Sequence, residues 1–233
     1  MRIQPRTAVR VGAAFAVLLA CTASSPVRAD RYGFEAAVRM GYGIPFGDIS
    51  RDTGELSRRV SGQFPLWLDL GYRAGPYVFA GLYGQYGFGS VANDEALDYC
   101  SAGNNPDGAE CAVRVLRAGA QVHLHVLPYR SLDPWFGVGI GYEHFASRKG
   151  GLVTTMAGFE AVNLQFGLDL KSAGNWFLGP WVAIALGRFT SGTRAGSQLC
   201  GEDVCTDSVP DGPIRDALAH QWLMFGVRIA FQP

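Results

Sequence analysis

The sequence predicts an all-β fold, an eight-stranded antiparallel up-and-down transmembrane β-barrel. Three observations predict it. Apolar residues recur at every second position in eight segments. Short turns alternate with long polar connections. Beyond the N-terminal region, no apolar run reaches the roughly 18 residues of a membrane helix. A closed barrel is the only other fold that satisfies every backbone group in lipid.

The composition supports a folded, β-rich chain. Glycine occurs 31 times, 12% of residues are aromatic and only 17% are charged, which disfavours disorder. Lys plus Arg and Asp plus Glu both number 20, so no net charge indicates binding to nucleic acid.

Residues 1–29 resemble a secretory signal peptide. Arg2, Arg6 and Arg10 precede an apolar stretch at 11–20, which is too short to span a bilayer. Small residues before position 30 suit cleavage after Ala29, so residues 30–233 are expected to form the barrel domain. Cys21 offers an alternative, because the preceding residues resemble a lipoprotein signal that ends at a lipidated cysteine.

Each predicted strand has one apolar face. Residues 32–44, 64–73 and 77–88 alternate in this way, and residues 116–126 do so most regularly. The later segments are 136–143, 162–171, 178–187 and 222–231. The apolar face carries almost no charge, as lipid contact requires. Pro180 falls on this face and predicts a strand start or a bulge.

The connections differ strongly in length. Short turns are expected at 73–76, 127–134 and 171–175, and long polar loops at 45–63, 89–112, 145–158 and 189–219. Short turns at one rim and long loops at the other are typical of outer-membrane barrels.

The opposite faces place four acids and four arginines in the lumen, where they would need to pair. This predicted lumenal charge network comprises Glu35, Arg39, Asp69, Arg73, Arg117, Glu143, Asp169 and Arg228. Eight strands enclose a space that side chains can fill, so we expect a plug. A path for ions or small solutes is the alternative. His123 and His125 share this face, and we expect structural roles rather than metal binding for them.

Four cysteines remain after the signal, in two long loops. Export to an oxidising compartment favours disulfides, and four cysteines allow three pairings. We choose Cys100–Cys111 and Cys200–Cys205, because these pairings close the shortest loops.

No catalytic, cofactor-binding or metal-binding motif is recognisable, and we expect a protein that is not an enzyme. A lipid-modifying enzyme would need Ser, His and an acid together near one rim. His144, Ser147 and Glu143 form the only local grouping, and alternation places His144 on the face opposite Glu143.

Segments such as residues 64–72, FPLWLDLGY, and 134–143, PWFGVGIGYE, resemble the small outer-membrane barrel proteins of Gram-negative bacteria, the OmpA/OmpX/OmpW-type group. The resemblance covers essentially residues 31–233. It implies a location in the outer membrane, contact with its lipids, and a role in envelope structure or surface interaction. We expect a monomer without cofactors. Passage of small or apolar solutes through a porin-like barrel is the alternative role, with the ligand unknown.

Overall fold

The computed structural model describes residues 32–51, 54–92, 111–149, 152–200 and 203–233. Its long barrel strands are β1 (Gly33–Ser50), β3 (Val60–Arg73), β4 (Val78–Val91), β5 (Cys111–His125), β6 (Leu132–Lys149), β7 (Leu152–Lys171), β8 (Trp176–Cys200) and β10 (His220–Phe231). Strands β2 (Gly54–Glu55) and β9 (Asp203–Pro213) and the 3-10 turn η1 (Leu56–Arg58) lie in the connections. The predicted signal segment, residues 1–29, lies outside the described residues.

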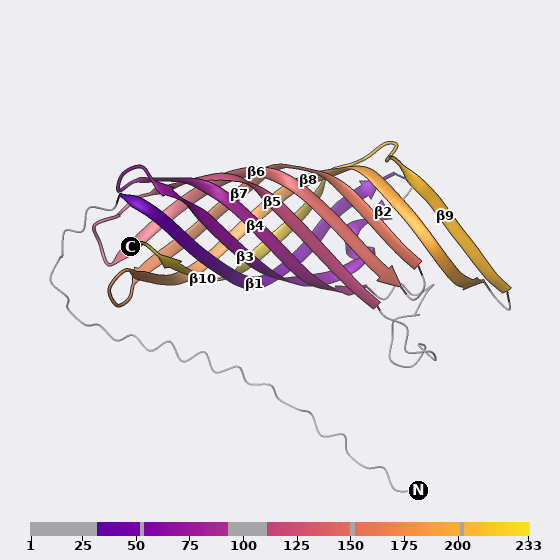
Figure 1. Cartoon of the computed structure of the whole chain (residues 1–233), viewed down its shortest axis with the longest axis horizontal. Helices are drawn as coiled ribbons and strands as arrows, with labels where there is room; N and C mark the ends of the chain where they lie inside the picture. The colour runs from indigo at the N-terminus through magenta and orange to yellow at the C-terminus, as the bar shows by residue number, and fades with distance from the viewer. Residues whose placement is uncertain (1–31, 52–53, 93–110, 150–151, 201–202) are drawn as a thin grey trace, which may run out of the picture.

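The long strands form a closed ring of tilted neighbours (Figure 1). Each pairs antiparallel with the next along the chain, and β10 pairs with both β8 and β1. The predicted eight-stranded up-and-down barrel is therefore confirmed. No helix among the described residues is long and apolar enough to cross a membrane.

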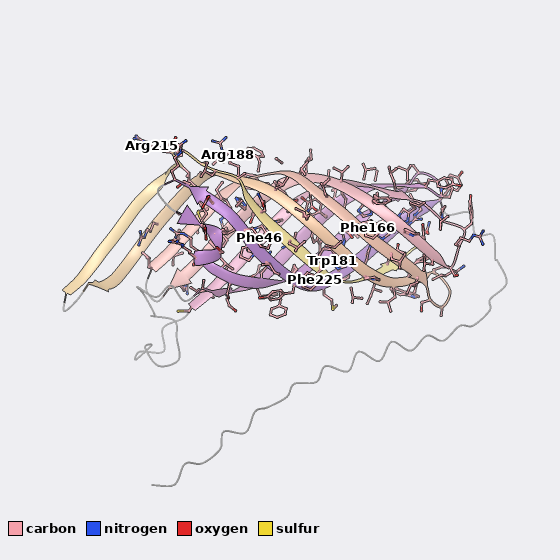
Figure 2. The ribbon with its side chains drawn as sticks, turned by 180° about the vertical axis from the view of Figure 1, so that it is seen from behind. Phe46, Phe166, Trp181, Arg188, Arg215 and Phe225 are labelled. Atoms are coloured by element: carbon pink, nitrogen blue, oxygen red, sulfur yellow. The ribbon has the colours of Figure 1, made fainter. Side chains whose placement is uncertain are left out.

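Alternation separates the two faces as the sequence predicts. In β3, Leu66, Leu68 and Leu70 are exposed on the outer surface, whereas Trp67 and Asp69 are completely buried. Every long strand exposes apolar side chains on the outer surface, and Figure 2 labels two of them, Phe166 and Phe225.

The strands extend well beyond the predicted segments, so the predicted loops at 145–158 and 189–219 are wrong in extent. Strands β6 and β7 continue into the first, and β8 and β9 form a hairpin that occupies much of the second. The apolar alternation that predicts strands is absent there, because exposed positions in and next to these segments carry polar groups, including Arg148 and Arg188. Backbone pairing continues where apolar alternation stops.

The period of two is interrupted in β7. The register shifts between Glu160 and Val162 in the pairing with β8, as expected for a bulge at Ala161. Glu160 and Asn163 are consequently both buried, although strict alternation would place them on opposite faces. Pro180 is paired with Val227 of β10, while the ladder to β7 is interrupted between Gly167 and Leu170.

Candidate functional site

The lumen near the short turns holds most of the predicted charge network. Arg228 donates hydrogen bonds to Glu35 at 2.7 Å and Asp169 at 2.6 Å. Arg73 donates to the other carboxylate oxygen of Glu35 at 2.8 Å. All these side chains are buried. Each charge has a partner that offsets the cost of leaving water.

Arg39 connects four strands across this part of the lumen. Its guanidinium binds both carboxylate oxygens of Asp69 on β3, at 2.6 and 2.7 Å. It also donates to Gln121 on β5 at 2.9 Å and Gln165 on β7 at 2.7 Å. Since Arg39 itself lies on β1, this one fully buried side chain links four of the eight barrel strands.

Indole rings surround the Arg39 guanidinium. Its central carbon lies 4.5 Å from the ring centre of Trp67 and 5.5 Å from those of Trp135 and Trp181. A cation over aromatic faces is attracted to their π electrons. The rings also fill the space that the narrower polar side chains leave. Gly167 permits this packing, because a Cβ there would collide with the Trp135 ring.

A second buried charge cluster lies closer to the long-loop end. Arg117 donates to Glu143 at 3.1 Å and its Nε lies 3.4 Å from Glu160. Glu160 also accepts hydrogen bonds from the Tyr83 hydroxyl at 2.6 Å and the Asn163 amide at 2.7 Å. Two glycines make room for Tyr83, since a Cβ at Gly119 would collide with its ring and a Cβ at Gly141 with its hydroxyl group.

Buried apolar side chains lie at the long-loop end of the lumen. Leu56, from turn η1, is fully buried and belongs to the same core cluster as Val113, Phe145 and Phe189. Burial of these groups removes apolar surface from water, which stabilises the turn over the barrel mouth. The lumen therefore contains polar charge clusters beneath an apolar cap.

The structure brings together all eight residues of the predicted lumenal charge network, in two clusters. Arg117 and Glu143 form the upper one, and the other six form the lower one with its ion pairs. Sequence analysis missed three lumenal partners: Asp133, Glu160 and His220.

Each of the three had a different reason for being missed. Asp133 lies in a predicted turn, yet it contacts His125 at 2.9 Å. Glu160 is turned inward by the bulge. His220 lies two residues before the start of the last predicted segment, at 222, and contacts Glu143 at 3.0 Å. Extending that segment's alternation by one step would have found His220, whereas nothing in the pattern indicated Glu160.

The two predicted lumenal histidines differ in environment. His125 contacts Asp133 and the guanidinium of Arg73. His123 is stacked on Trp135, with ring centres 4.6 Å apart. Among the described residues, no group of three or more His, Cys, Asp or Glu side chains could hold a metal ion.

The local grouping considered for lipid chemistry is divided between the two faces. His144 is exposed on the outer surface of β6, whereas Glu143 and Ser147 are buried on the lumenal side. Glu143 is already bonded to Arg117, His220 and Trp222.

The predicted disulfides stay predictions. Cys111 begins β5, while Cys100 lies outside the described residues. The register of β8 and β9 pairs Cys200 with Asp203 and Cys205 with Gln198.

The fold is similar to those of small outer-membrane β-barrel proteins. Neisserial surface protein A has a TM-score of 0.44 and 10% identity, over 86% of this chain and 97% of that one. OprG of Pseudomonas aeruginosa has a TM-score of 0.49 and 13% identity, over 87% of this chain and 98% of that one. Outer membrane protein W of E. coli has a TM-score of 0.33 and 16% identity, over 86% of this chain and 98% of that one. No protein-family model and no curated protein sequence matches the chain.

Proposed function

We propose that the chain is an integral, monomeric outer-membrane β-barrel with a plugged lumen and a structural or surface-interaction role, and that it is not an enzyme. The observation that carries this proposal is the Arg39 junction. It ties β1 to β3, β5 and β7 through hydrogen bonds of 2.6–2.9 Å inside a ring of eight strands.

Membrane insertion is supported by the outer surface. Its middle carries aliphatic side chains such as Leu68, Leu82 and Ile140, all exposed. Aromatic pairs flank this belt: Tyr77 with Tyr129 and Trp176 with Phe231 near the short turns, and Tyr42 with Phe64 and Tyr142 with Phe159 towards the long loops. An apolar band between aromatic girdles is characteristic of membrane barrels.

The extent of the belt agrees with a bilayer. On the outer face of β5, Arg114 precedes an uncharged run from Leu116 to residue 126. This length fits the roughly 9–11 residues of a tilted membrane strand. Arg188 marks the corresponding limit on β8, where it is paired with Phe159. The β8–β9 hairpin would then project beyond the membrane.

Plugging follows from the contents of the lumen. An ion crossing the barrel would have to separate the Arg39 junction and displace the apolar cap that includes Leu56 and Phe189. A buried charge that loses its partner is strongly destabilised, and the ion would itself lose water in a lumen that side chains fill. Because these costs add along the whole path, the barrel is expected not to conduct.

Conductance across a planar lipid bilayer tests the proposal. We expect no current steps from the folded protein, and a regular single-channel conductance would overturn the plug and favour the porin-like alternative. Arg39→Ala combined with Leu56→Ala weakens both the junction and the cap, and should admit water and produce measurable openings. Arg188→Ala is the matched control, because it removes the same charge from the outer face and should stay silent.

The proposal includes disulfide-braced external loops, through Cys100–Cys111 and Cys200–Cys205. Counting reactive thiols in the unfolded protein before and after reduction tests this bracing. Bracing by both disulfides predicts four additional thiols after reduction. No increase would remove this part of the proposal without affecting the plug.

A further inference from the structure

A cavity of about 320 Å³ lies at the long-loop end, outside the lumenal charge network. Its walls come from elements far apart in the sequence: the end of β1, the residue after η1, the start of β7, and the β8–β9 hairpin. This is the end at which β2 and β9 are labelled in Figure 1. The volume is within the range of small-molecule pockets, about 300–1,000 Å³.

Two arginines, Arg59 and Arg194, line the same cavity. The Nε of Arg59 is buried, and among the described residues no hydrogen-bond acceptor is within reach of it. The backbone fixes this residue, since its N–H donates to the Leu56 carbonyl at 2.9 Å and its carbonyl accepts from Ala92 at 3.0 Å. The backbone of Arg59 is thus fixed beside the cavity that this residue lines.

The positive charges of Arg59 and Arg194 act on each other at this site. Burial lowers the pKa of Arg59, and the like charge of Arg194 lowers it further. An anion between the two guanidiniums would reverse the second effect and supply the missing acceptor for Arg59. Arginine is particularly suited to phosphate and carboxylate groups, which it can bind with two parallel hydrogen bonds.

The remainder of the wall is largely apolar. Ile49, Met156 and Ile214 lie beside the arginines, and Thr154 and Thr155 add hydroxyl groups. Gly192 lines the cavity without a side chain. A simple inorganic anion would leave these apolar surfaces unused.

We propose that this cavity binds an anionic headgroup, a phosphate or carboxylate, that carries a short apolar chain. The arginines would bind the headgroup and the apolar wall would contact the chain. This inference does not depend on whether the lumen conducts, because the cavity lies outside the Arg39 junction.

Calorimetric titration of the folded protein in dodecyl maltoside tests the proposal with three probes: hexyl phosphate, inorganic phosphate and hexanol. We expect hexyl phosphate to bind about tenfold or more tightly than either of the others, since only it uses both parts of the wall. Equal binding of hexanol would exclude anion recognition. Absence of hexyl phosphate binding would overturn the proposal altogether.

Variants locate the binding. Arg59→Gln should weaken hexyl phosphate binding at least about tenfold, and Arg59→Lys should retain more of it because it keeps the charge. Arg188→Gln is the control, since it removes an arginine from the outer face of the strand that carries Arg194. Arg188 is labelled in Figure 2, and Arg194 lies further along β8, where this strand pairs with β9. Unchanged binding by a folded Arg59→Gln variant would refute the assignment.

The headgroup could belong to a membrane lipid or to a free amphiphile. Mass spectrometry of lipids that co-purify with the protein separates these sources. An anionic lipid retained by the unmodified protein and lost from Arg59→Gln would identify a lipid ligand. Hexyl phosphate binding without such a lipid would indicate a free amphiphile.

Discussion

At the residue scale, burial of charge is the dominant feature of this barrel. Arg39 and Asp69 are both completely buried, and their two hydrogen bonds are among the shortest of the network. Removing one member leaves the other charged, buried and deprived of its main partner. The cost of that state exceeds the net contribution of the intact pair, because the intact pair must offset its own desolvation.

Arg39→Met should therefore lower the free energy of unfolding by about 3–5 kcal/mol. Among the described residues, Asp69 would keep its hydrogen bond from Gln121 at 2.7 Å and a distant contact with Arg228 at 3.9 Å. The double variant Arg39→Met, Asp69→Asn should recover much of the loss, since it removes both charges. Urea unfolding in phospholipid vesicles, followed by tryptophan fluorescence, measures these differences. Equal stability of the single variant and the unmodified protein would contradict the assigned role of the pair.

Sequence alternation identified the lumenal side of every long strand, and with it the eight charged residues of the network. The prediction succeeded because the strands of a membrane barrel alternate between an apolar outer face and a polar inner face. It failed at Glu160, where a single extra residue reverses the faces. Pairings such as Arg228 with Glu35 were also beyond prediction, because they depend on how the ring closes.

At the element scale, the strands have two parts with different surroundings. The part within the aromatic girdles has an apolar outer face. The part beyond them is held by backbone pairing with mixed side chains, as in the β8–β9 hairpin. Sequence reasoning found the first part and described the second as loops, since only lipid contact imposes strict apolar alternation.

Shortening the β8–β9 hairpin should leave the barrel folded. Gly196 and Asp207 are directly paired, so a two-residue Asn-Gly turn can replace residues 197–206. Ring closure depends on the lower part of β8, where residues from Trp176 to Gly187 pair with β10. On an SDS gel, the unheated and the boiled samples of the shortened protein should migrate differently. The unmodified barrel should show the same heat-dependent shift. Loss of this heat-dependent shift would show that the hairpin is needed for closure.

At the scale of the whole molecule, the even number of barrel strands brings the beginning of β1 and the end of β10 to one rim. Ala36 is paired with Phe231, and the short turns lie at this same end (Figure 1). The apolar cap and the anion cavity lie at the other. In outer-membrane barrels the short turns face the periplasm and the long loops face outward, so the proposed cavity would open towards the exterior.

An epitope tag inserted between residues 100 and 101 should therefore be accessible to antibody on intact cells. A tag inserted after Tyr129, in the short turn between β5 and β6, should react only after the outer membrane is permeabilised. The matched insertions differ in the rim they occupy, so their contrast reports orientation rather than expression. Each tagged protein must first show the heat-dependent mobility shift of a closed barrel. Accessibility of the Tyr129 tag on intact cells would reverse the proposed orientation and place the anion cavity on the periplasmic side.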